Sequence, residues 1–152
     1  MRRRGERLHV RFAEVTDKAA LAELLDQLGY PCAPEQVEAR LEALAEREDH
    51  HVLVAELSLP TKECFLAGLG VLEVGYLFHA GARHGHLTSL VVDRRFRHRG
   101  VARALLAEIE AVARRSGCTR LHLRSHLRRD DAHAFCRAVG FEETHLDFER
   151  EL

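Results

Sequence analysis

The sequence predicts an α/β protein in which helices cover a mixed sheet. Two patterns alternate along the chain: short apolar segments typical of strands, and longer segments whose apolar residues recur at helical spacing. A chain of 152 residues, 46% of them hydrophobic, can bury a core and suits a single domain over residues 1–152. We expect residues 1–7 to form a flexible basic tail.

The first half of the chain is expected to contain three strands and two helices. Asp17 can cap the first helix, whose leucines fall at helical spacing, and Gly29 ends it. Pro34 suits the first turn of the second helix. In order, the expected elements are the strand His9–Ala13, the helix from Asp17 to Gly29, the helix from Pro34, and the strands His51–Leu57 and Phe65–Tyr76.

The second half is expected to alternate strands and helices after a loop over residues 79–85. Val101, Leu105 and Ile109 form one apolar face of the longest helix, which Gly117 stops. The order strand, helix, strand predicts a crossover between parallel strands. The expected elements are the strand His86–Val92, the helix Gly100–Arg115, the strand Leu121–Ser125, the helix Asp131–Val139 and the strand His145–Glu149.

Charge is distributed unevenly, although the net charge is −1. Residues 14–49 hold ten acidic and three basic residues, a net charge of −7. Residues 94–137 hold twelve arginines and four acidic residues, a net charge of +8. The two segments can present one surface suited to a cation and one suited to an anion, or they can be solvated helix faces.

The composition indicates neither secretion nor membrane insertion. No apolar run approaches the roughly 18 residues that a membrane span needs, and charged residues follow the basic start where a signal peptide would be apolar. The cysteines lie far apart with no C-x-x-C pair, which argues against a zinc finger or a disulfide framework. They are Cys32, Cys64, Cys118 and Cys136. We therefore expect a cytoplasmic protein.

Arginines crowd the junction between the strand His86–Val92 and the helix after it, with five of them inside residues 94–103. A helix N-terminus already carries partial positive charge, so this cluster makes physical sense if an anion binds there. Backbone N–H groups of residues 98–103 lack helical partners, and the small Gly100 and Ala102 let an anion approach. The alternatives are a solvated basic turn and a nucleic-acid-binding patch. The low aromatic content of 6% and the lack of a recognition motif argue against nucleic acid.

The run Arg97-x-x-Gly100-x-Ala102 matches R/Q-x-x-G-x-G/A, the acetyl-CoA signature of the GNAT acetyltransferase superfamily. The longer segment LVVDRRFRHRGVARALL resembles the family's strand, loop and helix around this signature. Downstream, DDAHAFCRAVGF resembles the family segment N-x-x-A-x-x-F-Y-x-x-x-G-F. The resemblance extends from residue 8 to the end. It implies the GNAT fold, a mixed, mostly antiparallel sheet of about six to seven strands with about four helices.

The resemblance also implies how acetyl-CoA binds. Main-chain amides of residues 98–103 would hold the diphosphate, and the strand residues 90–92 would pair with the pantetheine arm. Arg129 occupies the position of a family asparagine, and two residues of the next helix would line the pantetheine. The implied cofactor-binding residues are Leu90, Val91, Val92, Arg97, His98, Arg99, Gly100, Val101, Ala102, Arg103, Arg129, Ala132 and Phe135.

Two positions depart from the family pattern. Cys136 stands where much of the family has a tyrosine that acts as general acid, and Thr88 stands where a glutamate base is frequent. His86 shares a strand face with Thr88 by alternation, and its ordinary pKa of about 6.5 suits a base. Cys136 can donate a proton weakly or be a buried structural thiol, and His126 or His133 are alternative donors.

The acceptor is specified less well. By resemblance, the first two helices and the loop before the fourth strand form its site, and the acidic charge there favours a small cationic amine such as a polyamine or aminosugar. The pairs His84/His86 and His50/His51 lack a supporting carboxylate or cysteine, so we expect no metal. The family also suggests a homodimer formed through the C-terminal strand.

Two functions therefore remain open. The first is an acetyl-CoA-dependent N-acetyltransferase, an enzyme. The second is a catalytically degenerate sensor that binds acyl-CoA, which the residues at Cys136 and Thr88 motivate.

Overall fold

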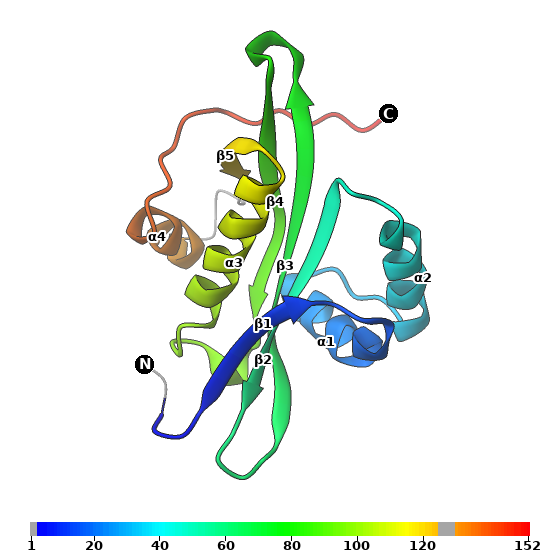
Figure 1. The fold of residues 1–152 in the computed structure, drawn as a ribbon, viewed down its shortest axis with the longest axis vertical. Helices are drawn as coiled ribbons and strands as arrows, with labels where there is room; N and C mark the ends of the chain where they lie inside the picture. The colour runs from blue at the N-terminus through cyan, green and yellow to red at the C-terminus, as the bar shows by residue number, and fades with distance from the viewer. Residues whose placement is uncertain (1–2, 125–129) are drawn as a thin grey trace.

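The computed structural model describes residues 3–124 and 130–152, and it shows helices on both faces of one sheet (Figure 1). The strands are β1 (Arg7–Phe12), β2 (His50–Ser58), β3 (Cys64–Leu77), β4 (Ala82–Val92) and β5 (Cys118–Leu123). The helices are α1 (Lys18–Leu28), α2 (Pro34–Ala45), α3 (Val101–Arg115) and α4 (Asp130–Ala138). Short 3₁₀ turns occupy Val15–Asp17, Phe78–Ala80 and Arg94–Phe96.

The sheet is mixed and mostly antiparallel, which confirms the predicted fold class. The strand order is β1-β2-β3-β4-β5, so the strands lie in the sheet in their order along the chain. Each neighbouring pair from β1 to β4 is antiparallel, whereas β4 and β5 are parallel. Helix α3 connects the parallel pair, as the sequence predicted.

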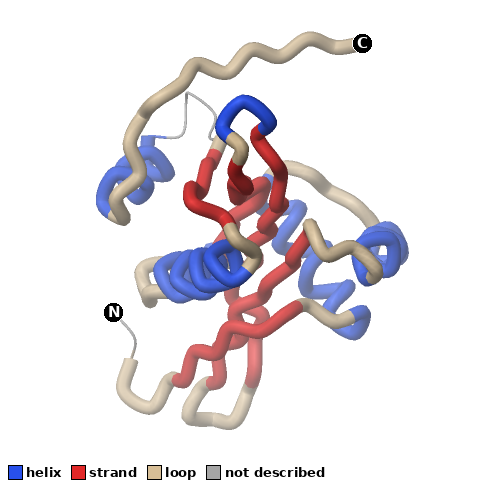
Figure 2. The backbone as a smooth tube through the Cα atoms, turned by 45° about the horizontal axis from the view of Figure 1, so that its top comes forward, coloured by secondary structure: helices blue, strands red, loops and turns tan. Residues whose placement is uncertain are grey.

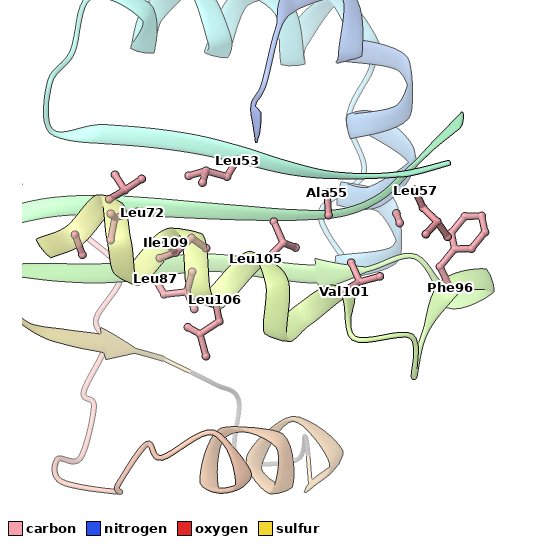
Figure 3. Close-up of a cluster of buried hydrophobic side chains, with 13 residues drawn as sticks. Leu53, Ala55, Leu57, Leu72, Leu87, Phe96, Val101, Leu105, Leu106 and Ile109 are labelled. Carbon is pink, nitrogen blue, oxygen red and sulfur yellow. The ribbon is translucent and has the colours of Figure 1, made fainter. Parts of the chain in front are cut away.

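Two buried clusters attach the helices to the sheet. One lies between the sheet and α3, where Leu87 of β4 and Ile109 of α3 are almost completely buried (Figure 3). The other lies between the opposite sheet face and the helices α1 and α2, with Leu21, Val37 and Val91 buried in it. Figure 2 shows the resulting layers, with helices on either side of the strands. Helices α1, α2 and α3 each bury an apolar stripe in one of these clusters.

Two glycines in β3 let α3 lie close to the sheet. A Cβ at Gly70 would lie 2.5 Å from Ile109 Cδ1, and a Cβ at Gly68 would lie 2.9 Å from both Leu105 Cδ1 and Val101 Cγ1. A side chain at either position would require these α3 side chains to shift, because protein cores are closely packed. The glycines that interrupt this strand are therefore a packing feature.

The structure corrects the prediction at both ends of the chain. The expected strand His145–Glu149 is absent, because the segment after Gly140 forms no ladder with any strand in the described residues. Alternating apolar residues favour a strand only where a partner edge is available. The sheet therefore has five strands in the described chain rather than the six or seven expected. At the other end, Arg7 begins β1, and Glu6 forms an ion pair with Arg99, so these two residues of the expected tail are joined to the fold.

Smaller differences affect the boundaries. Strand β4 begins at Ala82, four residues before the expected start, so most of the expected loop belongs to a long hairpin of β3 and β4. The expected end of β5 at Ser125 lies outside the described residues. No helix in the described part of the chain is long and apolar enough to cross a membrane.

Candidate functional site

A buried carboxylate organises the turn between β4 and α3. Asp93 is 2% exposed and accepts hydrogen bonds from Arg95 N and Arg95 Nη2, both at 2.8 Å, and from Gln27 Nε2 at 3.3 Å. The side-chain hydrogen bond from Arg95 is the main reason why the pKa of Asp93 lies below its ordinary value. Phe96, three residues later, is buried in the α3 cluster. The hydrogen bonds of Asp93 therefore hold the first residues of the turn in place.

The five arginines of this turn divide into two groups. Arg95 and Arg99 serve the fold: Arg95 binds Asp93, and Arg99 pairs with Glu6 and covers the ring of Phe96. The other three have exposed side chains with no hydrogen-bond or ion-pair partner within the described residues. They are Arg94, Arg97 and Arg103. Three of the five arginines at this turn are thus available to an anion from solvent.

The backbone at the start of α3 adopts a conformation that opens it to solvent. His98 and Gly100 have positive φ angles of 60° and 79°, and Gly100 is the residue before the helix. The first helical hydrogen bond runs from Ala104 N to Gly100 O at 3.0 Å, so the N–H groups of residues 101–103 have no partner within the helix. A Cβ at Gly100 would have no atom within 4 Å, so the space beside this residue is open.

Beside this turn, one edge of β4 has no strand partner in the part of the chain that the structure describes. The parallel ladder between β4 and β5 ends at the pair Leu87–Leu123. Beyond it, residues 88–92 pair only with β3 among the described residues, so their other edge has no strand partner there. Extended polar chains bind such edges through main-chain hydrogen bonds. The residues predicted to pair with pantetheine, Leu90, Val91 and Val92, lie on this edge.

A bulge in β4 lies just beyond the end of its parallel ladder with β5. Val71 pairs with Ser89 and Leu72 pairs with Leu87, which leaves Thr88 as an extra residue. As a result, the consecutive residues Thr88 and Ser89 both line a cleft of about 590 Å³, whereas successive residues of a regular strand point to opposite faces. The rest of the cleft comes from α1, α2 and the loop between them: Leu25, Leu28, Gly29, Tyr30, Pro31 and Arg40.

A group of histidines lies on the same sheet face, next to the bulge. Leu87 and Leu123 face the α3 cluster, so their neighbours His86 and His122 point to the opposite face, and these two histidines are cross-strand partners. Burial is the main reason why the pKa of each lies below its ordinary value. The rings of His84 and His122 meet edge to face at 5.5 Å. His84 Nδ1 and His122 Nε2 are buried without a hydrogen-bond partner in the described chain.

Glu73 also belongs to this group, although the sequence analysis did not identify it. It is the partner of His86 on β3, and its carboxylate raises the pKa of His86 while burial and Arg124 lower it. Its Oε2 atom also lies 3.8 Å from His50 Nε2. A single acidic residue inside a fourteen-residue apolar strand was the available signal. His122 carried a similar signal, as a lone polar residue between Leu121 and Leu123.

The predicted residues of α4 lie on the α3 side of the sheet (Figure 1). Ala132, Phe135 and Cys136 are all half-buried, and burial raises the pKa of the Cys136 thiol. Cys136 therefore does not share the sheet face of His86. Arg129 and the alternative donor His126 lie outside the described residues. Within residues 3–124 and 130–152, no three histidine, cysteine or acidic side chains are arranged to hold a metal ion.

Comparison with known proteins identifies the family of the chain. Residues 18–141 match the Acetyltransferase (GNAT) family. An aminoglycoside N(6')-acetyltransferase type 1 from Stenotrophomonas maltophilia is 32% identical over 139 residues, which cover 89% of this chain and 86% of that protein.

Two solved structures share the fold. An acetyltransferase from Trypanosoma brucei has a TM-score of 0.76 at 24% identity, over 96% of this chain and all of that one. An aminoglycoside N-acetyltransferase in complex with CoA has a TM-score of 0.80 at 21% identity, over 97% of each chain. The chain is therefore an acyltransferase that belongs to the GNAT acetyltransferase family.

Proposed function

We propose that the protein transfers the acetyl group of acetyl-CoA to a primary amine of a small acceptor that is cationic at neutral pH. One observation carries the proposal: an exposed, arginine-rich helix start lies directly beside a strand edge that no described residue pairs with. The first feature suits a diphosphate and the second suits a chain of amides, and CoA contains both. The two features lie at the place where the family signature falls in the sequence.

The donor site uses main-chain atoms more than side chains. The N–H groups of residues 98–103 at the helix N-terminus would hold the diphosphate, with Arg97 and Arg103 adding charge from either side. Arg99 contributes its backbone only, because its side chain is paired with Glu6. Residues 90–92 would bind the pantetheine arm along the free edge of β4, with Ala132 and Phe135 of α4 covering it. Arg129 remains part of the proposed site by its position in the family segment.

His86 is the proposed base. An aliphatic ammonium has a pKa of about 10.4 and must lose a proton before it attacks the thioester, which acetyl-CoA supplies in activated form. Because burial lowers the pKa of His86, the imidazole is neutral at pH 7 and can accept this proton, directly or through water. An amine bound in the cleft at Thr88 and Ser89 would lie on the same sheet face. Glu73, across the strand pair, stabilises the imidazolium that forms.

The leaving thiolate needs little assistance. A thiol of pKa about 8.5 is a tolerable leaving group near neutral pH. Cys136 keeps its proton at neutral pH because burial raises its pKa, and we propose it as a weak donor from the opposite side of the sheet. Much of the rate would then come from holding the amine and the thioester together.

Three further properties belong to the proposal. The net charge of −7 over residues 14–49 favours approach of a cationic amine, and the relative from Stenotrophomonas maltophilia is an aminoglycoside N-acetyltransferase. The four cysteines are free, which fits a reducing, cytoplasmic compartment. The C-terminal segment exposes Leu146 and Phe148 at 83% and 88%, which supports a homodimer that covers them.

The test is release of free CoA thiol from acetyl-CoA over a panel of primary amines. We expect CoA and acetyl-CoA to bind, and at least one cationic amine to be acetylated with a rate that rises with pH as the amine loses its proton. Tight acetyl-CoA binding without turnover of any amine would overturn the proposal and support the acyl-CoA sensor instead.

A further inference from the structure

Arg40 of α2 lines the cleft at the β4 bulge, together with Thr88 and Ser89. It is the one charged residue among the described residues that line this cleft. Its guanidinium contacts a sulfur atom, with Nη1 at 3.7 Å from Cys32 Sγ, and no carboxylate of the described chain pairs with it. The cleft therefore contains a cation that no described acidic residue neutralises.

The absence of a partner is unusual for this part of the chain. Residues 14–49 contain ten acidic residues and only three cations, so a cation there would be expected to find a carboxylate. The other two do: Lys18 pairs with Glu38, and Arg47 pairs with Asp49 at 2.7 Å. Of these three cations, Arg40 is the one without an acidic partner in the described chain.

The position of Arg40 on its helix explains why. The residues three and four positions away are Gln36, Val37, Ala43 and Leu44, none of which is acidic. At about 100° per residue, the acidic side chains of α2 fall on the side of the helix opposite Arg40. These acidic residues are Glu35, Glu38 and Glu42. The acidic charge of α2 therefore lies away from the cleft, and the cleft itself presents a positive group.

We propose that the acceptor carries an anionic group, a carboxylate or a phosphate, which binds Arg40 while its amine reaches the bulge at Thr88 and Ser89. This inference rests on the proposed acetyl transfer and narrows its acceptor to zwitterionic amines. The apolar part of such a molecule would lie against Leu25, Leu28 and Tyr30. A guanidinium matches the two oxygens of a carboxylate or phosphate and binds them with charge-assisted hydrogen bonds. The acidic surface outside the cleft would still attract the ammonium end.

The experiment compares amines that differ only by the acid group. Cadaverine and L-lysine test a carboxylate far from the amine, phenethylamine and phenylalanine test one beside it, and glucosamine and glucosamine 6-phosphate test a phosphate. Each pair is assayed with the wild type, with Arg40→Gln and with Arg40→Lys. Arg47→Gln is the matched control, because it removes an equal charge from the same segment outside the cleft.

We expect the wild type to favour the acid-bearing member of at least one pair. In Arg40→Gln the KM for that member should rise about tenfold to a hundredfold, while the KM for its acid-free partner stays unchanged. Arg40→Lys should retain part of the preference, and Arg47→Gln should retain all of it. An equal effect of Arg40→Gln on both members of every pair, or no effect on either, would overturn the inference.

A binding measurement separates this inference from the proposed function. Calorimetry with the protein saturated with CoA reports whether each amine binds, even if none is acetylated. Weaker binding of the acid-bearing amines to Arg40→Gln, without any turnover, would support the anion subsite and overturn the proposed function. Binding that is indifferent to Arg40 would overturn the subsite whether or not acetylation occurs.

Discussion

Replacing Gly100 with aspartate should weaken CoA binding about tenfold more than replacing it with asparagine. Gly100 lies at the proposed diphosphate site with a φ angle of 79°, where asparagine and aspartate are tolerated better than other side chains. No atom lies within 4 Å of a Cβ built there, so neither variant should clash with the protein. The two variants have nearly the same shape and differ in one negative charge.

The magnitude follows from Coulomb's law. A carboxylate about 5 Å from one phosphate charge is repelled by about 0.8 kcal/mol at the dielectric constant of water and by about 3 kcal/mol at an effective value of about 20. Because Gly100 is exposed, we expect a value toward the lower end, near 1.4 kcal/mol or about tenfold in Kd. The difference should shrink as salt is added, since exposed charges are screened.

Calorimetric titration of each variant with CoA measures this difference, and thermal unfolding confirms that both remain folded. Equal affinity of the folded aspartate and asparagine variants would refute the placement of the diphosphate at this turn. A difference that does not depend on salt would refute the electrostatic reasoning.

Four further substitutions test other parts of the structure. Asp93→Asn should lower the free energy of unfolding by about 1–3 kcal/mol at pH 7. Because Arg95 lowers the pKa of Asp93, the stabilisation from this carboxylate is present above about pH 3.9 and is lost as pH falls through the lowered pKa. Urea unfolding should therefore show a smaller difference between the variant and the wild type at pH 3. Glu6→Gln leaves the partly buried Arg99 without its anion and should cost about 1–3 kcal/mol by the same assay, and an unchanged midpoint would contradict the proposed role of this pair. His86→Ala should lower kcat/KM by about a hundredfold or more and remove an acid limb that lies below about pH 6.5, since burial lowers the pKa of His86; an unaltered pH–rate profile would exclude His86 as the base. Cys136→Ala should lower kcat by less than about tenfold, and a larger loss would make this thiol an essential acid.

The helices and the first five strands were predictable from local patterns. The leucines of α1, the proline that begins α2 and the apolar face of α3 each agree with the structure, because one face of each helix is buried in a cluster. The crossover from β4 to β5 followed from the order of elements alone. The strand expected at His145–Glu149 was wrong, because alternation says which residues share a face but not whether a neighbouring edge exists.

The part of the site formed by the backbone turn was predictable from the sequence. The side-chain contacts between distant residues were not. Gly100 and the arginine cluster identified the turn. The sequence did not indicate that Arg99 is occupied by Glu6, a residue ninety-three positions away. The cross-strand partnership of His86 with Glu73 and His122 likewise depends on the strand register and on the bulge at Thr88, which no local pattern specifies.

A crystal structure of the protein with CoA would test the central claim most directly. We predict that the diphosphate oxygens lie within hydrogen-bond distance of backbone N–H groups in residues 98–103, with the pantetheine arm along residues 90–92 of β4. A complex in which CoA binds elsewhere and leaves the start of α3 exposed to solvent would contradict the account.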